Sequence, residues 1–219
     1  MTGRRGTSAK LRGRSRNRPV EFVHQFLVVL ANTEPLIWRR FQVPEAYSLW
    51  DLHVAIQDAM GWEDSHLHEF NILHPASGRP QRLGIPHPDE PAERSLHPDW
   101  RALTTEYFTP GNPLALYVYD FGDDWRHVVV YEGTSPAVSS LAYPRCLGGA
   151  RACPPEDSGG PHRYAELLAA LANPTHPERA DFLAWAGDDF DPGAFNLAGV
   201  AFDDPEQRWK SSFEGDQNK

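Results

Sequence analysis

The sequence predicts an α+β fold: a single domain with a mostly antiparallel sheet of about five strands, one helix after the first hairpin and a cluster of helices at the C-terminal end. Two observations predict it. Strand-like runs come first along the chain and helix-like runs come last, an order that favours an antiparallel sheet over alternating βαβ units. The chain has 219 residues, of which 40% are hydrophobic, and this is enough apolar material for one good core.

The first two strands are predicted to form a hairpin. Residues 22–30 are almost continuously apolar, as in a strand that is covered on both faces. Turn residues at 32–35 separate them from 36–43, in which apolar and polar side chains alternate as in a half-buried strand. Pro44 then ends the hairpin.

A helix over 49–60 follows the hairpin. Ser48 stands at the position of an N-cap with Asp51 three residues later, and apolar residues recur at helical spacing behind them. Gly61 is typical of a C-terminal cap. The helix is therefore bounded at both ends by local sequence signals.

The middle of the chain predicts three more strands and one long excursion. Residues 67–73 indicate a third strand, and 114–121 and 125–132 indicate a hairpin joined by a Gly-Asp-Asp turn. Between them, 74–113 carries eight prolines and weak periodicity. We expect a surface excursion there, with one helical turn near 100–107.

Helices are predicted to close the domain. Apolar residues at helical spacing mark the first of them: Tyr164, Leu167, Leu168 and Leu171. The loop before this helix is expected to hold both cysteines and to place Asp157 or Ser158 near the helix N-terminus. Asn173 ends that helix, and Thr175 with Glu178 forms the capping box of a second one. A polar tail follows.

The charge of the chain is unevenly distributed. The net charge is −9, but seven basic residues and no acidic one precede Glu21, so the rest of the chain has 14 basic and 30 acidic residues. We expect a disordered basic tail over 1–20, an α+β domain over 21–210 and a polar tail over 211–219. An acidic body repels phosphate, so a contact with nucleic acid would depend on the tail from Arg4 to Arg18.

Cellular location follows from what the sequence does not contain. No stretch of about 20 apolar residues is available to span a bilayer, and the first twenty residues have no apolar core of a secretory signal. We therefore expect a cytoplasmic protein without a membrane partner. Cys146 and Cys153 are left open between a loop disulfide, two free thiols and a metal-binding pair, with free thiols the usual state in a reducing compartment.

Five spaced motifs stand out along the chain. They are Trp38-Arg39-Arg40, Leu52-His53 with Gly61-Trp62, His66-Leu67-His68-Glu69-Phe70, the run from Tyr119 to His127, and Cys153-Pro154-Pro155-Glu156-Asp157 with Gly159-Gly160. Together they resemble the Ri-plasmid ORF-3-like family, whose members are also filed as TnpR-like passengers of bacterial insertion sequences. The resemblance runs over 22–209 and implies a compact α+β domain of bacterial or mobile-element background. It implies no mechanism.

A polar constellation is predicted on the inner face of the sheet. Strand periodicity places His66 and His68 on the side of buried neighbours, places His127 on an inward face of the next hairpin, and brings Asp120 close by. We expect the four side chains to share one pocket. Imidazoles with a carboxylate are ligands for zinc or a similar divalent metal. The alternative is a satisfied polar network in which the histidines pair with Asp120, Asp123, Asp124 or Glu69.

Three functions are compatible with these features. The first is a non-catalytic binding or accessory module, because the sequence has no catalytic signature and lacks the residue sets of the serine and tyrosine recombinases. The alternative is a metal-dependent hydrolase in which His66, His68, Asp120 and His127 hold the metal and Glu69 or Glu156 moves protons. The third is a nucleic-acid accessory factor that uses the basic tail.

Overall fold

One mixed sheet organises the molecule. The computed structural model describes residues 19–87, 91, 95–187 and 189–214. Within them the strands are β1 (Phe22–Leu30), β2 (Ile37–Pro44), β3 (His68–Leu73), β4 (Pro80–Gly84), β5 (His97–Pro98), β6 (Leu114–Tyr119), β7 (Trp125–Pro136) and β8 (Arg145–Ala150). They line up as β5-β4-β3-β6-β7-β1-β2-β8, and every neighbouring pair is antiparallel except β4 and β5.

The prediction of about five strands is wrong, because the described residues form eight. The five predicted strands are all present as β1, β2, β3, β6 and β7. The three additional strands lie in segments expected to be loops, two in the proline-rich excursion and one in the segment with the cysteines. They are short and contain Pro or Gly. β5 and β8 are the two edge strands and β4 lies next to β5, so pairing with a neighbouring strand compensates for weak local propensity.

The helix after the first hairpin forms as its end signals predict. In α1 (Leu49–Met60), the Ser48 hydroxyl accepts from the Asp51 amide at 3.2 Å and the Asp51 carboxylate accepts from the Ser48 amide at 2.7 Å. Gly61 ends the helix with a left-handed φ of 92°, a conformation that costs glycine little. The capping box and the glycine cap are confirmed.

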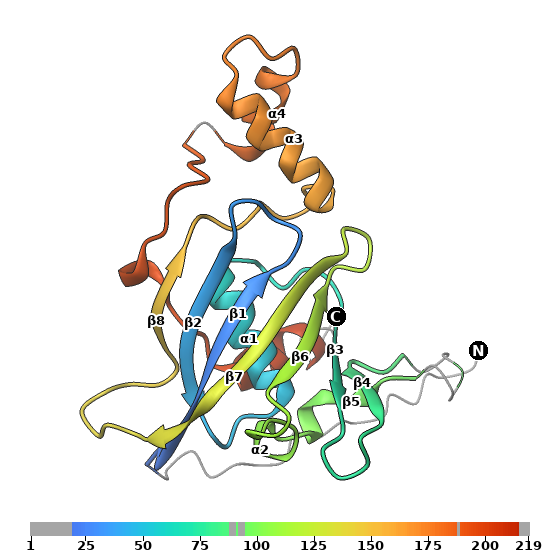
Figure 1. The fold of residues 1–219 in the computed structure, drawn as a ribbon, viewed down its shortest axis with the longest axis vertical. Coiled ribbons are helices and arrows are strands. Elements are labelled where there is room, and N and C mark those ends of the chain that lie inside the picture. Colours follow the sequence, from blue (N-terminus) through green and yellow to red (C-terminus); the bar gives the residue numbers. More distant parts are fainter. Residues whose placement is uncertain (1–18, 88–90, 92–94, 188, 215–219) are drawn as a thin grey trace.

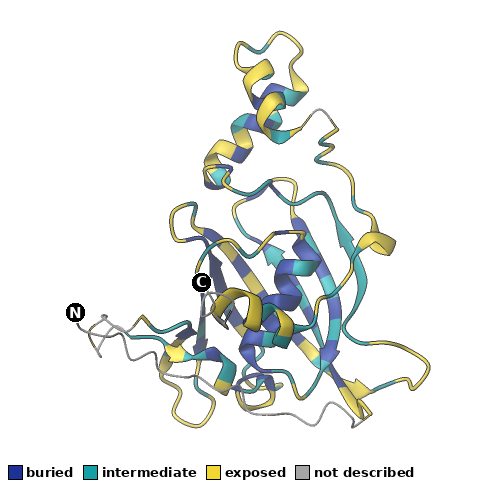
Figure 2. Cartoon of the chain, turned by 180° about the vertical axis from the view of Figure 1, so that it is seen from behind, coloured by how far each residue is buried: buried dark blue, intermediate teal, exposed yellow. Residues whose placement is uncertain are grey.

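The core lies between the sheet and α1. Figure 2 shows α1 lying across one face of the sheet. The inward side chains of the strands and the sheet-facing side of α1 are fully buried, among them Phe26, Phe41, Phe70, Leu52 and Ile56. Each such side chain contributes about 1.5–3 kcal/mol through burial. The excursion adds a 3₁₀ turn, η1 (Asp99–Arg101), and a short helix, α2 (Thr104–Tyr107).

Two further helices, α3 (Gly160–Ala172) and α4 (Arg179–Ala186), form a hairpin beyond one end of the sheet (Figure 1). The predicted capping box of Thr175 and Glu178 is wrong. The Thr175 hydroxyl instead donates to Asn173 Oδ1 at 2.9 Å, and Glu178 makes no side-chain capping bond at the start of α4. A local turn therefore competes successfully with the cap.

The C-terminal segment returns to the main body after a 3₁₀ turn, η2 (Leu197–Gly199). Helix α5 (Pro205–Trp209) packs on α1, where Trp50 Nε1 donates to the Pro205 carbonyl at 3.0 Å. A π-helical turn (Lys210–Glu214) continues it, so helical structure extends into the segment expected as a polar tail. The last described residues thus cover α1.

Two further expectations concern the basic N-terminal tail and membrane-spanning helices. Of the predicted basic tail over 1–20, residues 1–18 lie outside the described residues, and 19–20 are exposed and precede β1 without regular structure. None of the helices formed by the described residues has the length and apolar character needed to span a bilayer. The structure thus describes the sheet, the helices and the loops that join them.

Candidate metal site at three converging loops

Three loops meet at one end of the sheet: 61–67 after α1, 120–124 between β6 and β7, and 151–159 before α3. Three hydrogen bonds join them: Trp62 Nε1 to the Pro154 carbonyl at 2.9 Å, the Glu63 amide to Glu156 Oε1 at 2.8 Å, and the Gly159 amide to Asp123 Oδ2 at 2.8 Å. At Gly160 a Cβ atom would collide with the Asp123 carbonyl oxygen. Only glycine allows the third loop to approach so closely.

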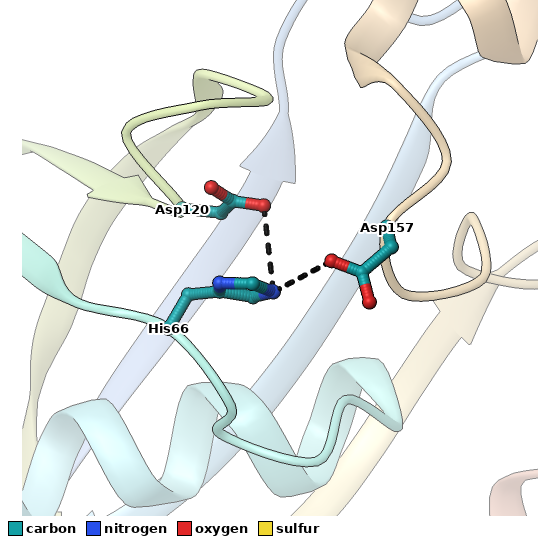
Figure 3. A group of neighbouring side chains, drawn as sticks. All are labelled: His66, Asp120 and Asp157. Carbon is teal, nitrogen blue, oxygen red and sulfur yellow. Dashed lines mark hydrogen bonds and ion pairs between the residues drawn. The ribbon is translucent and has the colours of Figure 1, made fainter.

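One polar side chain from each loop points to a common centre. Figure 3 shows Asp120 and Asp157 directed at the ring of His66. The Nε2 atom of His66 lies 2.8 Å from Asp157 Oδ1 and 3.6 Å from Asp120 Oδ2. The side chains are 31% (His66), 11% (Asp120) and 72% (Asp157) exposed. The cluster is therefore built on the body of the protein and open to solvent.

The turn between β6 and β7 fixes the orientation of Asp120. Its backbone has a left-handed φ of 53°, and its Oδ1 atom accepts from the amides of Gly122 at 2.9 Å and Asp123 at 3.3 Å. Because these bonds occupy one carboxylate oxygen, the other is directed at His66. Asp157 also has a left-handed φ, of 56°. Backbone conformations of this kind often occur at functional sites.

Tyr119 ties the three loops together beneath the cluster. Its hydroxyl accepts from the Ser65 amide at 2.9 Å and donates to Glu156 Oε1 at 3.0 Å. Burial and the neighbouring Glu156 raise the pKa of Tyr119, so the phenol keeps the proton that it donates. Ser65 precedes His66, Glu156 precedes Asp157, and Tyr119 precedes Asp120. Tyr119 is therefore the neighbour of one member of the cluster, and its hydroxyl binds the neighbours of the other two.

The cluster has the donor set of a divalent metal site. An imidazole nitrogen carries at most one hydrogen and satisfies one of the two carboxylates that face it. A divalent cation satisfies both carboxylates and the neutral imidazole, a combination suited to zinc or manganese. The three ligand atoms lie within 4.8 Å of one another. A tetrahedral ion with bonds of about 2.0–2.2 Å holds its ligand atoms roughly 3.3–3.6 Å apart. The 2.8 Å contact between His66 and Asp157 must therefore open slightly, a movement that the exposed Asp157 side chain can supply.

The structure does not bring the four predicted metal ligands into one pocket. His66 and Asp120 lie together, but His68 belongs to a separate buried group. Its Nε2 atom is 2.7 Å from Asp99 Oδ2, and its ring stacks on that of His53 at 3.5 Å between centroids. The expectation that histidines pair with carboxylates therefore describes His68, although the partner is Asp99 rather than one of the acids proposed.

His53 completes that buried group. Its Nδ1 atom is 2.8 Å from the Tyr117 hydroxyl and its Nε2 atom is 2.8 Å from Asp64 Oδ1. Burial lowers the pKa of His53 to about 4, so the ring is neutral near pH 7. Both nitrogens of His53 thus have a partner in the fold.

His127 is buried among aromatic rings. It faces inward as predicted, but its ring packs edge-on against Trp62 at 5.2 Å and beside Tyr117 at 5.2 Å. Burial lowers its pKa to about 3. Strand β6 lies between β3 and β7, and its inward Tyr117 fills the space between the two histidine-bearing strands. The expectation of one shared pocket did not account for this intervening strand.

The two acids predicted to move protons have structural contacts. Glu69 binds Arg82 and Asn71 on the sheet. Glu156 lies beside the cluster, but its carboxylate accepts from the Glu63 amide and from Tyr119. Burial raises the pKa of Glu156. These contacts assign Glu156 to holding the loops in place.

Sequence reasoning missed Asp157 as a member of the cluster and expected it near the start of α3. The N-cap of α3 is Gly159, whose amide binds Asp123, so the Asp157 side chain is free to turn toward His66. Both cysteines are free thiols in the structure. Burial raises the pKa of Cys153, which makes a thiolate ligand unfavourable.

The comparison with known proteins identifies the family. Residues 23–199 match the family described as plasmid pRiA4b ORF-3-like protein. The chain belongs to this family. The resemblance inferred from five short motifs is thereby confirmed, and the family covers the sheet, α1, α3 and α4 together with all three loops of the site.

Two known proteins are similar to most of the chain. One is the uncharacterized protein y4hQ of Sinorhizobium fredii, which is 37% identical over 193 residues that cover 87% of this chain and 95% of the relative. The other is the crystal structure of MM3350, a protein of unknown function from Methanosarcina mazei Go1. It is 43% identical, covers 83% of this chain and 99% of its own, and has a TM-score of 0.78. These relatives support the fold and name no activity.

Proposed function

We propose that this family member is a cytoplasmic, non-catalytic binding module that holds a divalent metal ion with His66, Asp120 and Asp157. The observation that carries the proposal is the convergence of two carboxylates on one imidazole nitrogen, all three atoms lying within 4.8 Å. Three separate loops supply these side chains, and hydrogen bonds hold the loops together. Such support is what a metal site needs in order to fix its ligands before the ion arrives.

The charge around the cluster also favours a cation. The loops that build it contribute further acids, namely Glu63, Asp64, Asp123, Asp124 and Glu156. Their field attracts a divalent cation and repels phosphate groups. The same field makes a nucleic-acid function at this end of the sheet unfavourable, and such a function remains a prediction for the basic tail alone.

A hydrolytic function has less support. A hydrolase of the kind considered needs a free carboxylate beside the metal to move protons. Glu156 is the nearest candidate, but its carboxylate already serves the Glu63 amide and the Tyr119 hydroxyl. Glu69 lies on the sheet with Arg82. The geometry therefore favours metal binding that orders or links loops over metal-assisted hydrolysis.

Calorimetric titration of chelator-treated full-length protein with Zn²⁺ and Mn²⁺ tests the proposal. We expect one ion per chain, and we expect His66→Ala, Asp120→Asn and Asp157→Asn each to weaken binding at least about tenfold. His162→Gln and Asp181→Asn are matched controls on exposed positions outside the three loops and should bind as the wild type does. Absence of binding, or equal binding by all variants, would refute the proposal.

A further inference from the structure

The sheet has two faces, and only one is covered by described elements. Figure 2 shows α1 across one face, whereas Figure 1 looks onto the opposite face, on which no described helix lies. An antiparallel sheet with one face in water normally alternates apolar residues inward with polar residues outward. The centre of this open face departs from that pattern.

An apolar patch occupies the middle of the open face. On β7, Val128 pairs with Leu116 of β6 on one side and with Val29 of β1 on the other. Two residues along, Val130 pairs in the same way with Leu114 and Leu27. The open-face patch is therefore two rows of three apolar side chains over three adjacent central strands. Leu114 is 55% exposed and Val128 is 40% exposed, so the patch is accessible.

Charged residues of both signs frame the open-face patch. They form the ion pairs Arg40–Glu132, Arg82–Glu69 and Arg126–Asp124. Next to Leu116, a hollow of about 380 Å³ is lined by two of these pairs. The frame has three basic and three acidic residues, so it is neutral, although the whole chain carries −9. A neutral frame adds no local repulsion between two copies of this acidic chain.

The segments outside the described residues cannot supply a cover. In 1–18 the only large apolar side chains are Met1 and Leu11, and 88–94 and 215–219 have none. A second copy of this chain presents the same two rows of apolar side chains. A two-fold axis across the strands brings the Arg126–Asp124 pair of one copy against the Arg40–Glu132 pair of the other, so each charge can meet one of opposite sign.

We propose that two copies of this chain pack face to face through the open-face patch. Face-to-face sheets lie about 10 Å apart, with their facing side chains interdigitated. The rows of Val, Leu and neighbouring residues supply that apolar layer, and the charged frame supplies the polar rim typical of a protein interface.

Sedimentation velocity of the full-length protein between about 1 and 100 μM tests the proposal. We expect the wild type to have twice the chain mass of 24.6 kDa, and Val128→Lys to have the single mass. Val138→Lys, at a position that is 51% exposed outside the patch, should remain dimeric. A wild type that stays monomeric throughout, or a folded Val128→Lys variant that stays dimeric, overturns the proposal.

A measurement on the wild type decides the question if Val128→Lys does not fold. In hydroxyl-radical footprinting, oxidation of Leu114 should fall at least about twofold from the lowest to the highest concentration, because the partner covers it. Leu197 is 45% exposed and belongs to η2, which contacts the edge strand β8 rather than the central strands. Its oxidation should not change. Equal oxidation of Leu114 at all concentrations overturns the proposal.

Discussion

Among the described residues, two groups combine histidine with aspartate. They differ in the number of carboxylates that face each imidazole ring. The buried group contains His53 and His68, and its known contacts are pairs: one carboxylate for each ring, with the Tyr117 hydroxyl on the remaining nitrogen of His53. The half-exposed cluster has one imidazole nitrogen, that of His66, facing two carboxylates. In the first group each ring has its own carboxylate, whereas in the second two carboxylates face one ring.

The difference shows which feature distinguishes a structural pair from a metal site. Histidine and aspartate occur in both groups, so residue type alone does not separate them. The ratio of carboxylates to imidazole nitrogens and the access of solvent do. One loop serves both groups, because 61–67 sends Asp64 into the buried group and His66 into the cluster. The buried group can thus anchor the loop on which the cluster depends.

The largest expected effect is on the buried group. Asp99 is fully buried and binds His68 at 2.7 Å. Asp99→Ala leaves the buried His68 nitrogen without its partner and should lower the free energy of unfolding by about 3–5 kcal/mol. Urea unfolding followed by tryptophan fluorescence measures this. A loss below about 1 kcal/mol would show that the pair does not contribute to stability as described.

The next effect is a loss of stability in acid. Burial places the pKa of His53 at about 4, below the value of about 6.5 expected in the unfolded chain. Between these values the unfolded chain binds more protons, so stability is complete above pH 6.5 and falls toward pH 4, by about 3 kcal/mol from this group. His127, with a pKa near 3, extends the loss below pH 4.

Urea unfolding at a series of pH values checks this dependence. The midpoint should decrease steadily from pH 6.5 to pH 4. His162→Gln, which changes a histidine whose side chain is 90% exposed, should follow the wild-type curve. A midpoint that is constant over this range would contradict the burial of neutral histidines.

Substitutions of the two tyrosines on β6 distinguish the role of the buried group from that of the cluster. Tyr119→Phe removes the phenol that holds Ser65 and Glu156 and should weaken metal binding about 10–100-fold, as supporting residues of metal sites do. Tyr117→Phe removes a phenol of the buried group and should lower stability while metal affinity stays unchanged. Titration calorimetry and urea unfolding of both variants give the comparison. Equal loss of metal affinity in both would mean that Tyr119 acts only through general stability.

The smallest effect on stability is expected at the exposed member of the cluster. The Asp157 side chain is 72% exposed, so Asp157→Asn should change the free energy of unfolding of the metal-free protein by less than about 0.5 kcal/mol. The same substitution weakens metal binding. If it destabilised the metal-free protein as Asp99→Ala does, the two groups would not differ in the way described.

Much of the fold could be predicted from local signals. Ser48, Asp51 and Gly61 fixed the ends of α1 because caps act over a few residues, and the two hairpins followed from apolar periodicity. Strand β8 could not be predicted, because its two glycines and its alanine have weak strand propensity and it exists through pairing with β2. Long-range pairing of this kind leaves no periodic signal.

The candidate site was predictable only in part. His66 and Asp120 were selected correctly as neighbours, because the strand end and the hairpin turn place them at the same end of the sheet. His68 and His127 were grouped with them because strand periodicity predicts which face of the sheet a side chain occupies. It does not predict which strands are adjacent, and strand order decides which side chains become neighbours. Asp157 comes from a loop distant in sequence. Its contribution depends on how α3 begins.

The most direct test of the central claim is a crystal structure of the protein grown with Zn²⁺, with diffraction data collected on both sides of the zinc absorption edge. We expect an anomalous peak bonded to His66 Nε2, Asp120 and Asp157 at about 2.0–2.2 Å, with none in the buried group of His53 and His68. An ion bound at His53 or His68, or no ion at the three-loop cluster in zinc-grown crystals, would contradict it.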